Sequence, residues 1–290
     1  MTTTTKGPAI IIMDKVIAQF YERWINSYYW EFCKDCLYTI DDKYAAYGLD
    51  PVRKMPTQEP YLKYLWGIAW IKRRVSQNKF RQGFLTNLYC VARKLVFGLF
   101  IEGSSSYVLK RAFNEAEVIL RTRIMNMYHN IPDQIELRQY DHPALGTIQV
   151  TVNPQKQNSE GNFFINNVIG VPDEMVNYRR LEINAKNSTI LGTINPKEIL
   201  PVPKYTQGMI TVERYTRTGK QMPPSFIYAL EGSVEKSRGI TASDATIDEA
   251  AYTENLVKVY TAISPACEYI QLISSPRPSL FQKFFYSMNS

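Results

Sequence analysis

The sequence contains few of the residues on which catalysis or covalent cross-linking usually depends. Its 290 residues include only two histidines and four cysteines. Four cysteines are too few for a disulfide scaffold in a chain of this length. The histidines, His129 and His142, have no nucleophile at a recognisable spacing, which leaves little room for histidine-dependent chemistry.

Long apolar runs are also absent. The best candidate, 95–101, has seven residues and is followed by Glu102, whereas a membrane-spanning helix needs about 20. The stretch 1–8 lacks the apolar core of a signal peptide. We therefore expect a chain that is not secreted by a signal peptide, does not associate with a membrane and keeps its thiols reduced.

Linear catalytic motifs are missing as well. The chain has no GxSxG, HExxH or GxxxxGK[ST], and no GxGxxG that follows a strand. Cys33-Lys-Asp-Cys36 has the spacing of a redox pair or of half a zinc site. It lies in a helical stretch, however, and Cys90 and Cys267 are not spaced as a second half-site. The sequence therefore predicts no catalytic residue, cofactor, metal or small-molecule substrate.

The first part of the chain has helical periodicity. Apolar side chains recur three and four positions apart, as at Val16, Phe20 and Trp24. We predict a flexible N-terminal arm over 1–12 and a helical domain over 13–132. Within that domain, the breaks at glycine, proline and serine clusters predict helices over 13–48, 61–74, 80–101 and 107–128.

The period then changes from helical to alternating. Ile148, Val150 and Val152 alternate with polar residues, and turn pairs such as Asn153-Pro154 separate the short runs. Short alternating strands with such turns are typical of antiparallel sheet. We predict an antiparallel β domain, a barrel or a sandwich, over 133–238.

Helical signals return after Gly239. Asp244 can cap a helix that continues to Ile263, with Asp248 and Glu249 in its first turns, where the helix dipole favours acids. We predict a C-terminal helix within 239–274 and an extended docking tail over 275–290. The fold class expected from these blocks is α+β.

Positive charge is concentrated in the first half of the chain. The net charge is +7, and 20 of the 34 basic residues lie at or before His142, against 14 of the 27 acidic ones. No acidic residue occurs between Glu59 and Glu102. A cluster in this interval predicts contact with nucleic acid or with an acidic partner, and a plain solvated helix face is the alternative. The cluster consists of Lys72, Arg73, Arg74, Lys79 and Arg81.

Aromatic residues are abundant and partly consecutive. The chain has 20 tyrosines, 13 phenylalanines and four tryptophans. One helix face cannot bury three consecutive aromatic residues, so at least one of the first such run faces away from its own core unless a partner covers it. A two-sided core helix is the alternative. The predicted assembly contacts are Tyr28, Tyr29, Trp30, Leu280, Phe281, Phe284 and Phe285.

Three functional hypotheses follow. The first is a structural subunit of a large oligomeric assembly, such as a phage connector, collar or minor capsid protein, located in the virion or the host cytoplasm. Its partners would be copies of itself and other structural proteins. The second is a nucleic-acid-binding protein that uses the basic cluster. The third is an enzyme with a site between the helical and β blocks, where Glu136, Asp141 and His142 are the first candidates.

Overall fold

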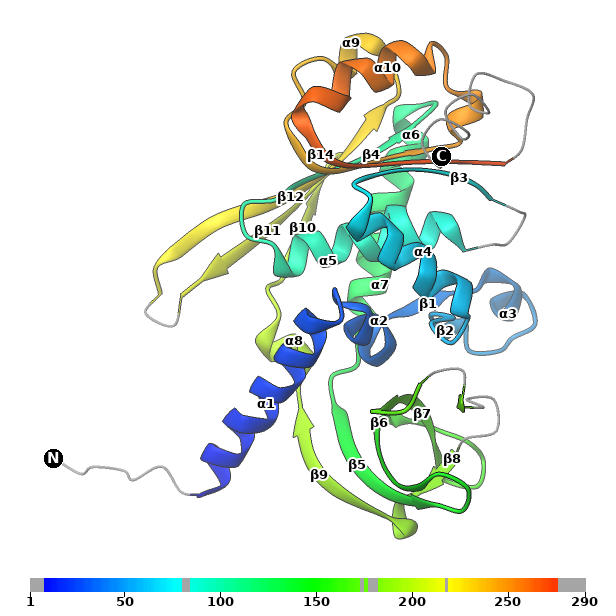
Figure 1. The fold of residues 1–290 in the computed structure, drawn as a ribbon, viewed down its shortest axis with the longest axis vertical. Coiled ribbons are helices and arrows are strands. Elements are labelled where there is room, and N and C mark those ends of the chain that lie inside the picture. The colour runs from blue at the N-terminus through cyan, green and yellow to red at the C-terminus, as the bar shows by residue number, and fades with distance from the viewer. Residues whose placement is uncertain (1–7, 80–83, 173–174, 177–181, 217–218, 276–290) are drawn as a thin grey trace, which may run out of the picture. The chain divides into compact units, whose positions relative to one another are not determined.

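The chain folds into two compact units, each assembled from segments that are far apart in the sequence. The computed structural model (Figure 1) describes residues 8–79, 84–172, 175–176, 182–216 and 219–275. Unit 1 comprises Met1–Tyr38, Lys54–Lys63 and Ile131–Ile199. Unit 2 comprises Thr39–Arg53, Tyr64–Asn130 and Leu200–Ser290.

Unit 1 contains a curled antiparallel sheet of five strands in the order β8-β7-β6-β5-β9 (Figure 1). Its strands are β5 (Ile135–His142), β6 (Gly146–Gln157), β7 (Asn162–Ile169), β8 (Glu182–Asn184) and β9 (Ser188–Ile194). Alternation places Ile148, Val150 and Val152 on one face of β6, where they are buried with Phe163 and Ile165 of β7. The apolar face of the half-barrel is therefore its core.

Helix α1 (Pro8–Asn26) lies beside β9 in unit 1 (Figure 1). The close approach depends on Gly192, because a Cβ atom there would lie 2.6 Å from Cγ2 of Val16. Tyr28 and Tyr29 have φ angles of 49° and 65°, which end the helical path before α2 begins. The short helices of this unit are α2 (Trp30–Cys36), η5 (Ala185–Asn187) and α8 (Pro196–Ile199).

Unit 2 contains a seven-stranded sheet in the order β10-β11-β12-β4-β13-β14-β3. The five strands from β12 to β3 are parallel, and β11 and β10 extend the sheet in antiparallel pairing. The strands are β3 (Arg74–Asn78), β4 (Ser105–Lys110), β10 (Pro203–Thr206), β11 (Met209–Tyr215), β12 (Gln221–Glu231), β13 (Ala242–Asp248) and β14 (Cys267–Ser274). Parallel neighbours require crossover connections, which the helices of this unit supply.

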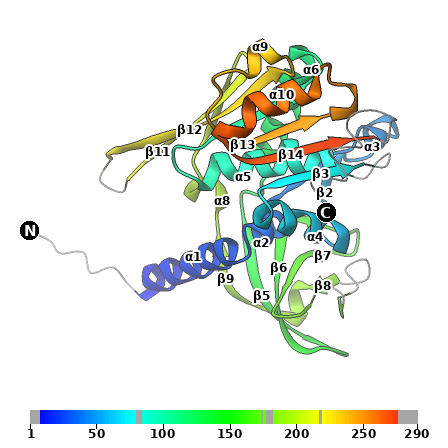
Figure 2. The same ribbon diagram turned by 45° about the horizontal axis from the view of Figure 1, so that its top comes forward.

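Helices cover both faces of this parallel sheet (Figures 1 and 2). On one face α10 (Leu256–Ile263) packs Leu256 and Val259 against a cluster that includes Ala245 and Ile247 of β13. The opposite face carries a continuous helix, in which six residues with π geometry, η1 (Asn87–Ala92), lead into α5 (Arg93–Phe100). Burial on both faces explains why β13 is buried at six of its seven positions.

The remaining elements complete the connections. The two-stranded sheet pairs β1 with β2. The bounds are β1 (Tyr38–Ile40), α3 (Asp42–Ala46), β2 (Val52–Lys54), α4 (Pro60–Ile71), α6 (Phe113–Val118), η2 (Ile119–Ile124), α7 (Met125–His129), α9 (Val234–Ser237), η6 (Ala250–Tyr252) and η7 (Ser264–Ala266). Within the described part of the chain, no helix combines the length and the apolar character needed to cross a membrane.

The expected α+β class is confirmed, with mixed helices and strands and a curled antiparallel half-barrel. The strand assignments differ from the expectation in one important respect. The alternating segments β10, β11 and β12 belong to the sheet of unit 2, because β12 pairs in parallel with β4. The antiparallel sheet of unit 1 therefore ends at Ile194 and does not extend over 133–238. Alternation identifies a strand but not its partner.

Two segments expected to be helical are strands. Ala242–Asp248 forms β13, and the helix predicted there begins only at Leu256. Ser105–Lys110 forms β4 at the start of the helix predicted over 107–128. A short apolar run is compatible with both a helix and a strand. These two segments are strands because they are buried between two layers of helices. Helix α1 already begins at Pro8, inside the expected arm, whereas 1–7 and the tail 276–290 lie outside the described residues.

Candidate functional site

The carboxyl ends of four parallel strands meet at one edge of the sheet in unit 2. In register, Asn78 of β3 pairs with Ser274 of β14, and Ile273 of β14 pairs with Asp248 of β13. Lys110 ends β4, the next strand along the sheet. In open sheets with parallel strands, ligands bind outside this edge. The side chains that gather there are therefore candidates for function.

Two side chains at this edge converge on the carboxylate of Asp248. The ammonium group of Lys79, directly after β3, lies 2.7 Å from Oδ1 of Asp248. The hydroxyl of Thr86, directly before η1, donates to Oδ2 of the same carboxylate over 3.2 Å. Lys79 also donates to the Thr86 hydroxyl over 3.3 Å. Lys79 and Thr86, which lie on either side of the segment 80–83 in the sequence, thus both contact the end of β13.

A second cation and a second carboxylate extend this group. Lys110 lies 3.3 Å from Oδ2 of Asp248 and 3.6 Å from Oε1 of Glu249. Glu249 has a φ angle of 59°, a left-handed conformation that is uncommon outside glycine, and its amide donates to Asp248 over 3.0 Å. The Glu249 side chain is 40% exposed, whereas that of Asp248 is 1% exposed. The carboxylate of Asp248 is therefore buried at this edge of the sheet, and that of Glu249 reaches the solvent.

The charges of the group are mutually stabilised. Burial by itself lowers the pKa of Lys110, but the carboxylates of Asp248 and Glu249 outweigh it, and the net pKa lies above the ordinary value. Lys110 is therefore a cation throughout the neutral range. The two ammonium groups of Lys79 and Lys110 are thus balanced by the two carboxylates of Asp248 and Glu249.

A buried ionic network holds β13 beneath this edge. Asp244 receives Nε of Arg93 at 2.9 Å, Nζ of Lys94 and Nε2 of Gln271 at 2.9 Å. Burial raises the pKa of the Asp244 carboxyl, but Arg93 and Lys94 outweigh it and hold the pKa below its usual value. Thr246 donates to Oε1 of Gln271 over 2.7 Å, which links β13 to β14. The strand that presents Asp248 is therefore anchored to α5 and to its neighbour in the sheet.

The guanidinium of Arg93 also stacks against aromatic rings. It lies 4.3 Å from the ring centre of Trp70 and 5.1 Å from that of Tyr269. Trp70 in turn stacks on Phe97 with ring centres 5.1 Å apart. Aromatic faces stabilise a desolvated cation. Of the aromatic residues in the acid-free interval, Phe97 is accordingly buried in unit 2 and Trp70 is half-buried there.

The structure divides the predicted basic cluster. Lys72 and Arg73 are exposed, and Nη2 of Arg73 lies 4.0 Å from Oε1 of Glu268. Arg74 instead donates to the backbone carbonyls of Ser264, Cys267 and Glu268. Lys79 belongs to the group around Asp248, and Arg81 lies outside the described residues. Contact of this cluster with nucleic acid or an acidic partner stays a prediction.

The predicted assembly contacts are placed only in part. Tyr28 is 56% exposed, whereas Trp30 is 3% exposed, so the consecutive aromatics do divide between solvent and core. Tyr29 is half-buried, and burial raises the pKa of its hydroxyl. The tail residues Leu280, Phe281, Phe284 and Phe285 lie outside the described residues. Their role in assembly stays a prediction.

The other candidates have structural partners. Cys33 and Cys36 are buried thiols of α2, and burial raises the pKa of both. Glu136 pairs with Arg138, Asp141 accepts from Thr147 over 2.7 Å, and His142 accepts backbone amides in the turn after β5. Within the described residues, no group of three or more His, Cys, Asp or Glu side chains is arranged to hold a metal by itself.

Thr86, Lys110, Asp248 and Glu249 were not predicted as functional residues. The two acids were assigned to the first turns of a helix, although they end the strand β13. A usable signal was present, because the short run Ala245-Thr-Ile247 ends in two adjacent acids at 248–249. A lysine and a threonine also flank the segment between a strand and a helix. Neither signal is specific without knowledge that the strands are neighbours in a parallel sheet.

Comparisons with known proteins give little beyond this geometry. No known protein family and no curated protein matches the chain. Among solved structures, the large terminase ATPase domain of Thermus phage P74-26 is similar at a TM-score of 0.40 and 15% identity, covering 86% of this chain and 74% of that one. A mutant of the same domain gives a TM-score of 0.40 at 14% identity, covering 86% and 75%. A likeness of this degree carries no functional argument.

Proposed function

We propose that unit 2 binds a nucleoside triphosphate together with Mg²⁺ and hydrolyses it. The observation that carries the proposal is the convergence of Lys79, Thr86 and Asp248 at the carboxyl ends of parallel strands. In P-loop nucleotide hydrolases, a serine or threonine hydroxyl and an aspartate from a second strand hold Mg²⁺, and a lysine binds the phosphates. The described residues supply each of these groups.

The order of the elements supports the same proposal. Along the chain, β3 ends at Asn78 and the next described helix includes η1 from Asn87, and in phosphate-binding motifs a helix likewise follows a strand. Asp248 ends β13, which is separated from β3 by β14 alone. The hydroxyl and the carboxylate are hard oxygen donors, which Mg²⁺ prefers. Because Mg²⁺ usually takes most of its ligands from water and phosphate, one carboxylate and one hydroxyl suffice.

The segment departs from the usual phosphate-binding sequence at its end. Where that motif has glycine and lysine before the threonine, this chain has Phe84 and Leu85. Leu85 is 3% exposed and apolar, so it offers the phosphates no charge. Lys79, seven positions before Thr86, provides an ammonium group already in contact with the threonine hydroxyl. We therefore assign the phosphate-binding lysine to Lys79.

The remaining side chains have roles that fit hydrolysis. Hydrolysis forms a bond between a water oxygen and the terminal phosphorus and breaks the bond from that phosphorus to the bridging oxygen of the diphosphate. The exposed carboxylate of Glu249 is the group that can orient the water and accept its proton. Lys110 positions Glu249 and Asp248 by contacting both. When bound, Mg²⁺ would neutralise charge on the phosphate oxygens.

The proposal departs from two expectations of the sequence analysis, namely that the chain is no enzyme and takes no small molecule. The sequence lacks the linear phosphate-binding motif because Phe84 and Leu85 stand where that motif has glycine and lysine, and Lys79 and Asp248 are 169 positions apart. Their proximity depends on the parallel sheet. Only the folded chain therefore reveals the candidate site.

Nucleotide binding and phosphate release by the full chain test the proposal. We expect a fluorescent ATP or GTP analogue to bind with Mg²⁺, and the chain to release phosphate. Thr86→Ala should lower the rate of phosphate release by at least about tenfold, because the hydroxyl is a proposed ligand. Thr261→Ala is a matched control, since Thr261 donates only to a carbonyl of its own helix, Val257. Absence of nucleotide binding by the wild-type chain, or equal rates for both variants, would overturn the proposal.

Self-association remains a second candidate property. The observation in its favour is that Tyr28 is 56% exposed at the turn between α1 and α2. Large aromatic residues are enriched at protein interfaces. A structural role in a virion would require such association. Sedimentation of the full chain and of Tyr28→Ser tests it, with an oligomer expected for the former and a smaller species for the latter.

Nucleic-acid binding also remains a proposal, resting on the exposed Lys72 and Arg73. Binding through phosphates would weaken steeply as salt is raised. The double variant Lys72→Glu with Arg73→Glu should weaken it further. Absence of binding to single- or double-stranded DNA and RNA at low salt would exclude this property.

A further inference from the structure

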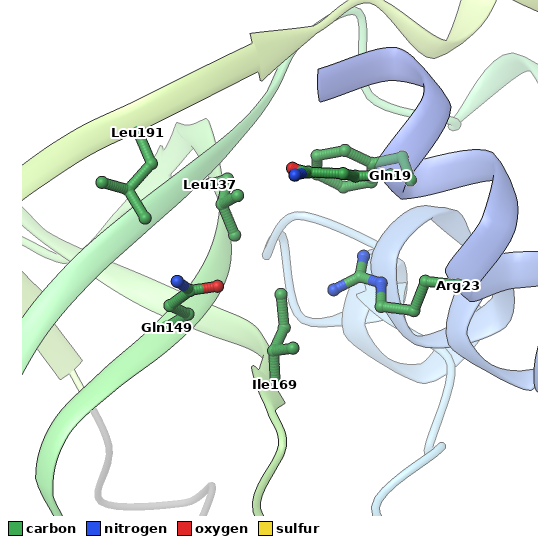
Figure 3. Close-up of a pocket in the computed structure, with 7 residues that line it drawn as sticks. Gln19, Arg23, Leu137, Gln149, Ile169 and Leu191 are labelled. Carbon is green, nitrogen blue, oxygen red and sulfur yellow. The ribbon is translucent and has the colours of Figure 1, made fainter. Parts of the chain in front are cut away.

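A cavity in unit 1 contains a cation with unused hydrogen-bond donors. The cavity has a volume of about 370 Å³ and lies between α1 and the half-barrel sheet (Figure 3). Its walls are formed by Phe20, Leu137, Ile169 and Leu191, and its polar groups are Gln19, Arg23 and Gln149. An apolar pocket with a few polar groups is typical of a small-molecule site.

Arg23 is only partly satisfied by the protein. Its Nη2 donates to the buried carboxylate of Asp35, which holds the guanidinium in place. Its Nε and Nη1 are buried and have no hydrogen-bond partner among the described residues. Figure 3 shows the guanidinium directed from α1 toward the space beside Gln149 and Ile169. A buried donor without an acceptor is costly, so an acceptor from a ligand would stabilise this arrangement.

Asp35 interacts with a second cation besides Arg23. Besides Arg23 it accepts Nε1 of Trp24 at 2.8 Å and Oγ1 of Thr151 at 2.7 Å, so its oxygens are fully engaged. Its charge also raises the pKa of Lys54, although burial dominates and lowers that pKa to about 8. The Lys54 ammonium is buried without a hydrogen-bond partner among the described residues. Two cations thus share one carboxylate, and Arg23 is the one of the two that lines the cavity.

We propose that this cavity binds a carboxylate attached to a compact apolar group. The carboxylate accepts from Nη1 of Arg23, and the amides of Gln19 and Gln149 are available to its second oxygen. The apolar group is buried against Leu137, Ile169 and Leu191. A volume of about 370 Å³ limits the ligand to the size of a medium-chain fatty acid or of one terminal residue of a peptide.

The cavity shares no residue with the group around Asp248. Its occupancy is therefore measured separately from nucleotide binding, and failure of either proposal leaves the other untouched. Two kinds of ligand carry a carboxylate on an apolar group, namely a free acid and the carboxyl terminus of a peptide. A carboxylate on an apolar group is common to both, and the two arms of the experiment distinguish them.

The experiment is isothermal titration of the full chain with octanoate and with a hexapeptide that ends in leucine. Methyl octanoate and the amidated hexapeptide are the matched neutral probes. We expect at least one of the acids to bind, and its neutral counterpart to bind at least about tenfold more weakly. A free acid is the source if only octanoate binds, and a chain terminus is the source if the peptide binds more tightly.

Variants locate the binding in the cavity. Leu191→Trp fills it without touching the pair of Arg23 and Asp35, and should abolish binding of the acid. Ile190→Trp is the matched control, because Ile190 precedes Leu191 on β9, is 50% exposed and does not line the cavity. Arg23→Gln should remove the preference for the acid over its neutral counterpart. Absence of binding of both acids, or equal binding to the Leu191→Trp variant, would overturn the proposal.

Discussion

The hydroxyl of Thr86 donates to Oδ2 of Asp248 over 3.2 Å, although 162 positions separate the two residues. Lys79 contacts both of them. A threonine at the start of a helix, an aspartate at the end of a strand and a lysine that contacts both are the groups that we propose for binding Mg²⁺ and a triphosphate. Their mutual contacts already bring the three side chains together.

Asp248→Asn should separate nucleotide binding from hydrolysis. The amide keeps the shape of the side chain but removes the charge proposed to hold Mg²⁺, so phosphate release should fall about 100-fold or more. Binding without Mg²⁺ should persist or tighten, because Lys79 and Lys110 lose their shared carboxylate partner. Glu213→Gln, in an exposed pair with Lys204, is the control for a carboxylate lost elsewhere in unit 2. Unchanged phosphate release by Asp248→Asn would exclude its role.

Lys79→Ala should weaken nucleotide affinity by about tenfold, because it removes the ammonium group assigned to the phosphates. Lys79→Arg should retain part of that affinity, since it keeps the charge. Titration with a fluorescent nucleotide measures both, and Lys204→Ala serves as the control because Lys204 forms an exposed pair. If Lys79→Ala binds nucleotide as well as the control does, the assignment of the phosphate-binding lysine is wrong.

Asp244→Leu should strongly destabilise the chain. The substitution leaves Arg93 and Lys94 buried without a counter-charge, which typically costs about 3–5 kcal/mol. The exposed pair offers a comparison, because Glu213→Leu should cost about 1 kcal/mol or less. Urea unfolding followed by tryptophan fluorescence measures both. Equal unfolding midpoints would show that the network contributes no more than a surface pair.

Lys54 should make stability rise with pH in the alkaline range. Burial lowers its pKa to about 8 in the folded chain from 10.5. Between these values the unfolded chain binds more protons than the folded one, so the free energy of unfolding increases with pH, by at most about 1.4 kcal/mol per pH unit. Below this window Lys54 is charged in both states, and the cost of burying it is present in full. Lys54→Met should lack the rise.

Denaturant unfolding of both proteins at several pH values from about 7 to about 10 measures this difference. Lys54→Met should be the more stable protein at the neutral end, because it removes the buried charge. Lys186→Met, at an exposed lysine of the same unit, should keep the wild-type slope. A Lys54→Met variant with the same slope as the wild type would show that other groups cause the rise.

Gly192→Ala should destabilise unit 1, and Val16→Ala should compensate. The new Cβ would lie 2.6 Å from Cγ2 and 2.8 Å from Cγ1 of Val16, a clash of the kind that costs about 1–3 kcal/mol. Shortening Val16 removes both atoms. A double-mutant cycle in thermal unfolding should therefore show a coupling free energy of at least about 0.5 kcal/mol. Additive effects would contradict the close approach of α1 and β9.

Burial of side chains is predicted correctly from the sequence where the geometry of the backbone itself sets their periodicity. Val16, Phe20 and Trp24 are all buried along α1, and Ile148, Val150 and Val152 are buried along β6, as their spacing predicts. The strand of Ala245 and Ile247 was assigned to a helix. Its short apolar run fits either state, and the acids at 248–249 also fit the first turn of a helix.

Neighbouring residues in the sequence do not predict which strands pair with one another. The alternation in β12 predicts a strand, but its pairing with β4, over a hundred positions earlier, follows from burial in the complete sheet. The candidate site depends on the same pairing, because β13 lies between β4 and β14, and β14 pairs with β3. The sequence therefore predicts Lys79 as part of the basic cluster and Thr86 as part of the helix over 80–101.

By itself, the sequence determined the α+β class, the helical spacing of α1, the alternation in β6 and the basic character of the first half. Each of these depends on neighbouring residues and on the fixed periods of helix and strand. Only the tertiary structure decided which strands are parallel neighbours, and with it the meeting of Lys79, Thr86 and Asp248. The physical reason is that strand pairing is selected by the free energy of burying whole faces, to which the entire chain contributes.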